Sequence, residues 1–169
     1  DIALEGIAMP CYIFTFHAFG TWMPDREKGF VRRRQGILPP DEELARHYRV
    51  RAKESEVVFD SRLQLILIEE TRVACANQQY RGHYIATEPT HIHSLVSWPD
   101  ERTCMKIRSG LKSSLTRRLN REVQPRDKWF VENAGGKQVK DDSHFDYLVN
   151  TYLPSHSGWK WREGGESFR

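Results

Sequence analysis

Continuous and alternating apolar runs along the chain predict several β-strands. The run 11–16 is rich in aromatic and β-branched residues, and the runs 83–87 and 91–98 have the same character. Two further short runs, 129–131 and 138–140, flank a glycine-rich stretch, which we expect to form a loosely closed hairpin or a flexible connection. The chain therefore carries enough strand-like segments for one sheet.

Apolar residues at helical spacing predict three longer helices between and after these strands. The first is capped by Asp60-Ser61 and ends near Gln79. The second begins at 99–100, and the third is capped by 141–143 and continues through Tyr152. This order of elements predicts an α+β fold, a mainly antiparallel sheet with helices packed on one face.

Length and composition predict a single domain. The chain has 169 residues, of which 38% are hydrophobic and 29% charged, as expected for one globular domain over 1–169. This domain includes an excursion at about 23–58, in which a short helix follows Pro40, and a tryptophan-containing tail at about 154–169. We expect no membrane association, because the apolar run 63–68 is far shorter than the ~20 residues that a membrane span needs.

Basic residues are concentrated in one predicted helix. The whole chain has 26 basic and 23 acidic residues, a net charge of +3. The stretch 101–124, which contains the second long helix, has seven basic residues and only two acidic ones. Such a stripe is typical of a contact with a phosphate backbone, although a helix face in solvent produces the same pattern.

His91 and His93 form the clearest candidate for a chemical site. Residues two apart in a strand point to the same face, so the two imidazoles stand together while Ile92 points into the core. Two neutral imidazoles held in this way can bind one divalent metal ion. We expect His17, at the end of the first strand, to be structural or incidental. The residues alone leave the third ligand open among Glu88, His83, His144 and His156.

A tyrosine accompanies one of these candidate ligands. Tyr152 and His156 are four residues apart and share a face if the helix continues that far, although Pro154 can end it earlier. A tyrosine hydroxyl beside a metal-bound phosphate is a workable nucleophile. The alternative is that Tyr152 belongs to the core, since it continues the apolar stripe of Leu148 and Val149.

The motifs around the two histidines resemble those of a known family. The stretch Glu88-Pro-Thr-His-Ile-His-Ser-Leu-Val96 resembles a segment of the single-tyrosine HUH transposases, which include the REP-associated tyrosine transposases. The helix containing Lys106-Ile-Arg-Ser-Gly-Leu-Lys112, then Trp129, a Gly-Gly pair and a helix that carries a tyrosine follow in the family's order. The resemblance extends from about residue 11 to about residue 161.

This resemblance implies a fold, an activity and a set of partners. The implied fold is the ferredoxin/RRM-like HUH endonuclease palm with a mobile C-terminal helix that carries the tyrosine, Gly135-Gly136 serving as its hinge. The implied activity is cleavage and joining of single-stranded DNA, often at hairpin ends, through a 5′-phosphotyrosine intermediate with Mg or Mn. His91, His93 and His156 would hold the metal, and Tyr152 would attack. The family also implies a homodimer in the bacterial cytoplasm, associated with the nucleoid when bound to DNA.

Two features of the sequence leave alternatives to these assignments. The family usually has Gln or Asn where His156 stands, and imidazole suits Mn, Co, Ni or Zn better than Mg. Tyr147 is a second candidate nucleophile, five residues before Tyr152. On an α-helix this spacing separates the two side chains by about 140°, so only one should face the metal. We favour Tyr152, because Thr151, four residues after Tyr147, is a poor ligand.

Binding of single-stranded DNA requires cations for phosphates and flat side chains for bases. The candidate nucleic-acid-binding residues lie in the basic helix, in an arginine cluster of the excursion and in the tail: Lys106, Arg108, Lys112, Arg117, Arg118, Arg121, Arg32, Arg33, Arg34, Trp159 and Trp161, with Trp22 as a further aromatic candidate. Tryptophans are also common packing residues, so packing remains the alternative to base stacking.

Three classes of function are compatible with these features. The leading one is a metal-dependent transposase-like nuclease and strand-transferase with a tyrosine nucleophile. The alternative is a domesticated module of the same fold that binds hairpin DNA or RNA without cleaving it, although a pure binder has no use for two such histidines and a tyrosine. A hydrolase in which water attacks is least favoured, because no carboxylate that could act as a general base follows the histidines.

Overall fold

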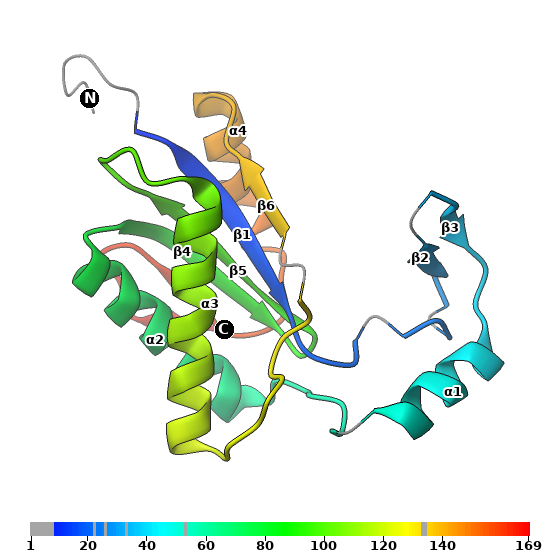
Figure 1. Cartoon of the computed structure of the whole chain (residues 1–169). Helices are drawn as coiled ribbons and strands as arrows, with labels where there is room; N and C mark the ends of the chain where they lie inside the picture. Colours follow the sequence, from blue (N-terminus) through cyan, green and yellow to red (C-terminus); the bar gives the residue numbers. More distant parts are fainter. Residues whose placement is uncertain (1–8, 22, 26, 33, 53, 133–134) are drawn as a thin grey trace.

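Six antiparallel strands form the central sheet, in the order β6-β1-β5-β4-β7-β8 (Figure 1). Their bounds are Cys11–His17 (β1), Arg81–Glu88 (β4), His91–Ser97 (β5), Gly135–Gln138 (β6), Lys160–Arg162 (β7) and Ser167–Phe168 (β8). The computed structural model describes residues 9–21, 23–25, 27–32, 34–52, 54–132 and 135–169. The strands nearest the two histidines, β1, β5 and β4, are thus the central ones.

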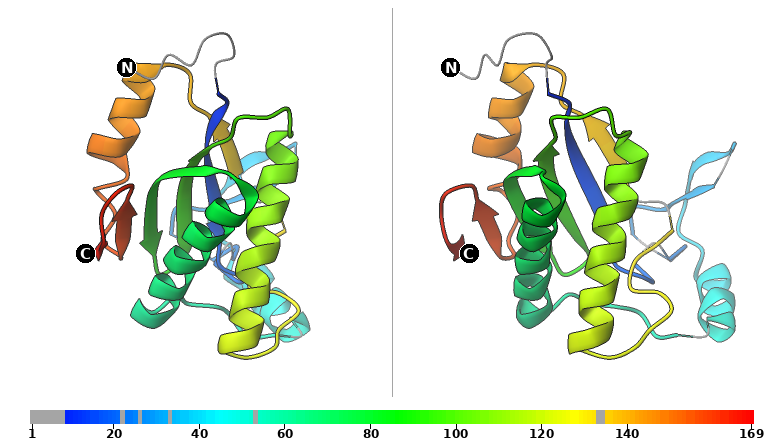
Figure 2. Two further views of the ribbon diagram at one scale, coloured as in Figure 1. Left: turned by 90° about the vertical axis from the view of Figure 1, so that its left-hand side faces the viewer. Right: turned by 60° about the vertical axis from the view of Figure 1, so that its left-hand side comes forward.

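Two long helices cover one face of this sheet (Figure 2). α2 (Ser61–Gln78) and α3 (Cys104–Glu122) bury their apolar stripes against alternate residues of β5, such as Ile92 and Val96. Neither these helices nor any other among the described residues is long and apolar enough to cross a membrane. The predicted α+β arrangement, a sheet with helices on one face, is confirmed for these two helices.

A shorter helical segment packs on the opposite face of the sheet. α4 (Asp142–Tyr147) runs directly into a π-helix, η1 (Leu148–Tyr152). This segment buries Leu148, Val149 and Leu153 in a second, smaller core with residues of β1, β4 and β5, namely Ile13, Tyr84, Ala86 and Leu95. Because side chains alternate along a strand, one sheet supplies both cores. The tyrosine segment is therefore separated from α3 by the whole sheet (Figure 2).

Side-chain caps determine where the helices begin. Asp60 and Asp141 accept hydrogen bonds from main-chain amides in the first turns of α2 and α4, as predicted. α3, however, begins later than the predicted 99–100, with Thr103 as its N-cap. Asp100 does not cap it, because its carboxylate accepts hydrogen bonds from the main chain and side chain of Arg102 in a turn before the helix.

The two glycines expected to form a hinge lie in an edge strand instead. Gly136 pairs with Phe14 across β6 and β1, and a Cβ atom there would lie 3.2 Å from the phenyl ring. The predicted hairpin between 129–131 and 138–140 is wrong for the described residues, because β6 pairs with β1 rather than with the first of these runs. A glycine pair hydrogen-bonded into a sheet, as Gly135-Gly136 is, is a poor hinge.

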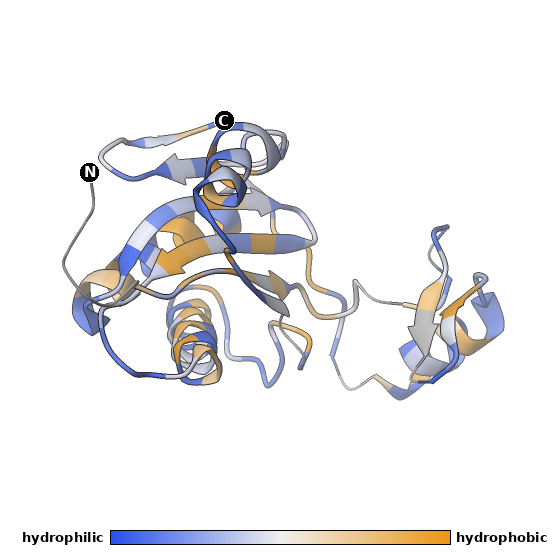
Figure 3. Cartoon of the chain, turned by 90° about the horizontal axis from the view of Figure 1, so that it is seen from above, coloured by the Kyte–Doolittle hydropathy of each residue, from blue (hydrophilic) through white to orange (hydrophobic). Residues whose placement is uncertain are grey.

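The excursion stands apart from the main body (Figures 1 and 3). It contains a short hairpin, β2 (Phe30–Arg32) and β3 (Gly36–Leu38), followed by α1 (Glu42–Arg51). α1 confirms the helix predicted after Pro40, and Asp41 caps it. The hairpin was not predicted, because strands of three residues are too short to show an alternating pattern.

Candidate metal centre and nucleophile

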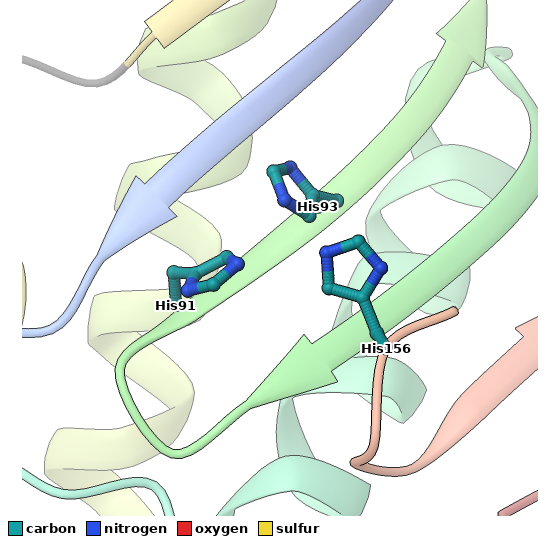
Figure 4. A group of neighbouring side chains, drawn as sticks. All are labelled: His91, His93 and His156. Atoms are coloured by element: carbon teal, nitrogen blue, oxygen red, sulfur yellow. The ribbon is translucent and has the colours of Figure 1, made fainter. Parts of the chain in front are cut away.

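Three imidazoles converge on the face of the sheet that carries the tyrosine segment (Figure 4). His91 and His93 project from β5, and His156 reaches them from the loop that follows η1. One ring nitrogen from each residue lies within 4.8 Å of the other two, which is close enough for a shared metal ion. Ile92, between the two strand histidines, is fully buried on the other face, as the strand pattern predicts.

The Nδ1 atom of each of the three imidazole rings has a hydrogen-bond partner. Nδ1 of His93 bonds the Thr15 hydroxyl at 2.8 Å, and Nδ1 of His91 bonds the Thr90 hydroxyl at 2.9 Å. Nδ1 of His156 lies 3.0 Å from the carbonyl oxygen of Tyr152, so it must carry the proton and Nε2 keeps its lone pair. Such partners orient imidazole ligands in metal sites, so the donor set fits a bound divalent cation.

The environment keeps the strand histidines neutral. Burial, reinforced by His17 and His156, lowers the pKa of His91 to about 4. Burial, reinforced by His91 and the same two imidazoles, lowers the pKa of His93 to about 3. Because a metal ion binds the neutral imidazole, both residues are ready to act as ligands at neutral pH without first losing a proton.

Tyr152 lies beside this group. Its hydroxyl is 3.3 Å from Nε2 of His93, and its ring centroid is 5.1 Å from that of His156. Burial, reinforced by the nearby Tyr147, raises the pKa of the Tyr152 phenol, so the hydroxyl keeps its proton in this state. The predicted proximity of Tyr152 to His156 is therefore observed, even though the α-helix does not continue that far.

Tyr147 lies on the same side of the segment as Tyr152. The two rings stack with centroids 6.3 Å apart and an angle of 28° between their planes. The expectation that helix geometry separates them by about 140° is wrong, because a π-helix bonds residues five apart, as Leu153 to Leu148 here. Tyr147 is 53% exposed, whereas the Tyr152 hydroxyl meets His93.

An open cavity connects the two tyrosines to the edge of the sheet. It has a volume of about 540 Å³ and lies between β6 and the tyrosine segment. Its lining includes His93, both tyrosines and His144 of α4, together with Gly135, Gly136 and Lys137 of β6. An extended polar chain could therefore reach the Tyr152 hydroxyl from the β6 edge.

The other candidate third ligands have different partners. Both carboxylate oxygens of Glu88 accept hydrogen bonds from Ser157. His83 bonds Ser97, and Nδ1 of His144 accepts a hydrogen bond from a main-chain amide at the start of α4. Among the four candidates, only His156 joins the two strand histidines in a group whose ligand atoms all lie within 4.8 Å of one another.

Sequence reasoning missed two residues of β1 that line the group. Thr15 bonds His93, and His17 pairs directly with His91 across β1 and β5, with ring centroids 5.5 Å apart. The sequence holds a signal for both, because residues 15 and 17 share the two-residue spacing of the histidine pair. The spacing alone does not show that these residues face the histidines; that requires the register between β1 and β5.

The basic residues of α3 lie on the other face of the sheet from the histidines (Figure 2). Arg118 is in ion pairs with Glu69, Glu70 and Glu122, and Arg121 also approaches Glu122. Lys112 donates hydrogen bonds to two main-chain carbonyls in the loop after the helix. The exposed cations of the helix include Lys106 and Arg117, whereas Arg108 is partly buried.

The remaining predicted DNA contacts are dispersed. Trp161 is only 8% exposed, and the Arg72 guanidinium lies over its ring at 5.0 Å, so the structure favours packing for this residue. Trp159 is half-buried against the same core. The structure places Arg32 in β2 and exposes Arg34 in the following turn. Arg33 and Trp22 lie outside the described residues.

Comparison with known proteins shows a likeness to several solved structures. No family model and no curated protein matches the chain. The REP-associated tyrosine transposase bound to a REP hairpin aligns with a TM-score of 0.48 and 11% identity, over 90% of this chain and 69% of that one. A candidate transposase from Deinococcus radiodurans R1 aligns with a TM-score of 0.50 and 10% identity, over 94% and 99%. The chain thus has the antiparallel α+β fold of the Deinococcus protein, and the predicted fold class is confirmed.

Proposed function

We propose that the protein is a metal-dependent endonuclease and strand-transferase of the transposase type, which acts on single-stranded DNA through Tyr152. One observation carries this proposal: the Tyr152 hydroxyl is 3.3 Å from His93 within a group of three converging imidazoles. A nucleophile, a cation site and a cavity open to an extended chain thus occur together. The resemblance of 88–96 to the HUH segment supports the same activity.

The residues that would hold the metal are His91, His93 and His156. A divalent cation there would polarise a phosphate oxygen and stabilise the charge that develops during attack. Three imidazoles without a carboxylate favour Mn, Co, Ni or Zn over Mg. Of the two cofactors that the family resemblance implies, we therefore propose Mn.

Tyr152 would exchange one phosphorus–oxygen bond of the DNA strand for another. The Tyr152 oxygen forms a bond to phosphorus while the bond from phosphorus to the 3′-oxygen breaks. The phenol loses its proton and the leaving 3′-oxygen gains one, which gives a 5′-phosphotyrosine and a free 3′-hydroxyl. Attack by a 3′-hydroxyl on the phosphotyrosine reverses these bonds and joins two strands.

The strand to be cleaved would enter along the cavity beside β6. Lys137 supplies a cation there, and Gly135-Gly136 presents no side chain to hinder a sugar-phosphate backbone. Tyr147, stacked on Tyr152 and half-exposed, offers an aromatic face for a base. Exposed cations of α3, such as Lys106, would contact DNA away from the cleaved phosphate, because they lie on the face of the sheet opposite the three histidines.

The test uses hairpin oligonucleotides with a labelled single-stranded extension, incubated with the protein and Mn. We expect a covalent protein–DNA adduct that resists SDS and that Tyr152→Phe does not form. Cleavage without any adduct would overturn the tyrosine mechanism. Binding without cleavage, with every metal tried, would favour the domesticated hairpin-binding module.

A homodimer, which the family resemblance implies, is also part of the proposal. Tyr152 and the three histidines come together within one chain, so each subunit would carry its own site. Light scattering of the protein with and without hairpin DNA tests the dimer. Mixing Tyr152→Phe with His93→Ala protein tests whether the sites are shared, and we expect no recovery of adduct.

A further inference from the structure

We infer that Glu88 positions the third metal ligand, by anchoring the His156 loop to the sheet, so that the metal centre forms independently of the Tyr152 side chain. The loop concerned comprises residues 156–159, between η1 and β7. The inference rests on the metal site of the proposed function but not on its tyrosine chemistry. Glu88 acts through His156 and is a positioning residue.

Glu88 fixes the residue that follows the ligand. One carboxylate oxygen accepts a hydrogen bond from the Ser157 amide at 2.6 Å, and the other accepts one from the Ser157 hydroxyl at 2.8 Å. Burial alone would raise the pKa of the Glu88 carboxyl, but the Ser157 hydrogen bonds outweigh burial and hold that pKa below its usual range. The Glu88 carboxylate is therefore ionised at neutral pH, and its hydrogen bonds from Ser157 are of the stronger, charge-assisted kind.

Glu88 also ties this loop to the other two ligands. It is the last residue of β4 and pairs directly with His91 in β5. A carboxylate on one strand thus determines where His156 stands relative to a ligand on the next strand. Because β4 and β5 are neighbouring strands in the middle of the sheet, the relative positions of the three ligands depend on the register between these two strands.

Further contacts hold the rest of the loop, both internally and against α2 and β4, where Thr87 donates a hydrogen bond to the Trp159 carbonyl oxygen at 2.6 Å. Lys160, only 6% exposed, donates hydrogen bonds to the carbonyl oxygens of His156 at 2.7 Å and Gly158 at 3.0 Å. The buried Gln64 accepts a hydrogen bond from the Trp159 amide at 3.0 Å. At Gly158, a Cβ atom would lie 2.1 Å from a carbonyl oxygen of β4, so the loop approaches the strand as closely as only glycine allows.

The tyrosine segment is held differently. Its contacts with the sheet come mainly from Leu148, Val149 and Leu153, which are apolar and non-directional. His156 touches this segment through carbonyl oxygens of the main chain, including that of Tyr152. Tyr152→Phe removes only the hydroxyl, so the ring contact with His156 and the main-chain contacts that orient the ligand loop remain.

Binding of Co²⁺ to the purified protein without DNA tests the inference. Co²⁺ in a histidine site gives visible absorption bands, and titration gives its affinity. We expect Glu88→Gln to weaken binding by about tenfold or more, the range seen for residues that orient metal ligands. We expect Tyr152→Phe to bind within about twofold of wild type, since its ring supplies no ligand in the site. Glu163→Gln, which alters a carboxylate that pairs with Arg81 outside the site, is the matched control.

Ser157→Ala provides a second, milder variant that keeps the main-chain donor to Glu88 and should weaken binding less than Glu88→Gln does. Equal affinity in wild type, Glu88→Gln and Ser157→Ala would overturn the positioning role, as would a loss in Tyr152→Phe as large as that in Glu88→Gln. Absence of binding to wild type would overturn both this inference and the proposed metal site. Normal Co²⁺ binding without adduct formation would overturn only the tyrosine chemistry.

Discussion

Tyr147 and Tyr152 stack on each other, with ring centroids 6.3 Å apart, although five residues separate them along one helical segment. The stacking depends on the π-helix at Leu148–Tyr152, which brings residues five apart to the same side. Both tyrosines consequently line the cavity beside His93. The choice of nucleophile therefore depends on distance to the metal site, and Tyr152 is the nearer residue.

Separate substitution of Tyr152 and Tyr147 tests which of the two is the nucleophile. We expect Tyr152→Phe to abolish the covalent DNA adduct, because the hydroxyl next to His93 is lost. Tyr147→Phe should retain adduct formation within about threefold of wild type, since it keeps the aromatic face that stacks on Tyr152. Denaturing gels of labelled oligonucleotide measure both. An adduct that survives in Tyr152→Phe and disappears in Tyr147→Phe would transfer the nucleophile to Tyr147.

The stability of the metal-free protein should fall in mild acid. The folded-state pKa is about 4 for His91 and about 3 for His93, against about 6.5 in an unfolded chain. Between about pH 6.5 and pH 4 the unfolded state binds more protons, so the free energy of unfolding decreases as the pH falls. We expect a Tm at least about 4 °C lower at pH 5 than at pH 7, by calorimetry.

The double variant His91→Gln/His93→Gln is the control for this pH dependence. It lacks both groups whose protonation is suppressed by folding, so its Tm should change much less between pH 7 and pH 5. A fall as large as that of wild type would assign the pH dependence to other residues.

Metal selectivity should follow the donor atoms. With three imidazoles and no carboxylate, we expect Mn²⁺, Co²⁺ or Zn²⁺ to raise the Tm at pH 7 at concentrations where Mg²⁺ has no effect. His156→Ala should reduce this stabilisation strongly. Thermal unfolding with each cation measures the effect, and an equal response to Mg²⁺ would show that the imidazoles do not determine selectivity.

Charge reversal on the two faces of the sheet tests the path of the DNA. Lys137 lines the cavity with both tyrosines, whereas Arg117 is exposed on α3 beyond the sheet. We expect Lys137→Glu to weaken binding of a short single strand by about tenfold and Arg117→Glu to change it by less than about twofold. Fluorescence anisotropy at fixed salt provides the affinities. The opposite ranking would place the single strand on α3.

A methyl group at Gly158 should disturb the ligand loop without changing any charge. The added Cβ would lie 2.1 Å from the carbonyl oxygen of Thr87, so the loop must move away from β4. We expect Gly158→Ala to lower the Tm by about 4 °C or more and to weaken metal binding. Gly165→Ala, where a Cβ would lie 3.4 Å from its nearest neighbour, is the matched control and should leave both unchanged.

Local patterns in the sequence predicted the central elements and part of the candidate site. Period-two alternation in 91–98 placed His91 and His93 together and Ile92 in the core, because neighbouring side chains of a strand point to opposite faces. Helical periodicity and capping residues predicted α2 and α4 in the same way. These features depend on interactions within a few residues, which a sequence displays directly.

The tertiary structure decided what depends on pairing between distant segments. It selected His156 among four candidate ligands, because the Ser157 contacts of Glu88 hold that loop against β4. The register of β1 against β5 brought His17 beside His91, and the π-helix placed both tyrosines on one side. The first two outcomes depend on contacts between residues far apart in the chain, which no local pattern encodes. The π-helix is local, but the apolar stripe of the tyrosine segment did not distinguish it from an α-helix.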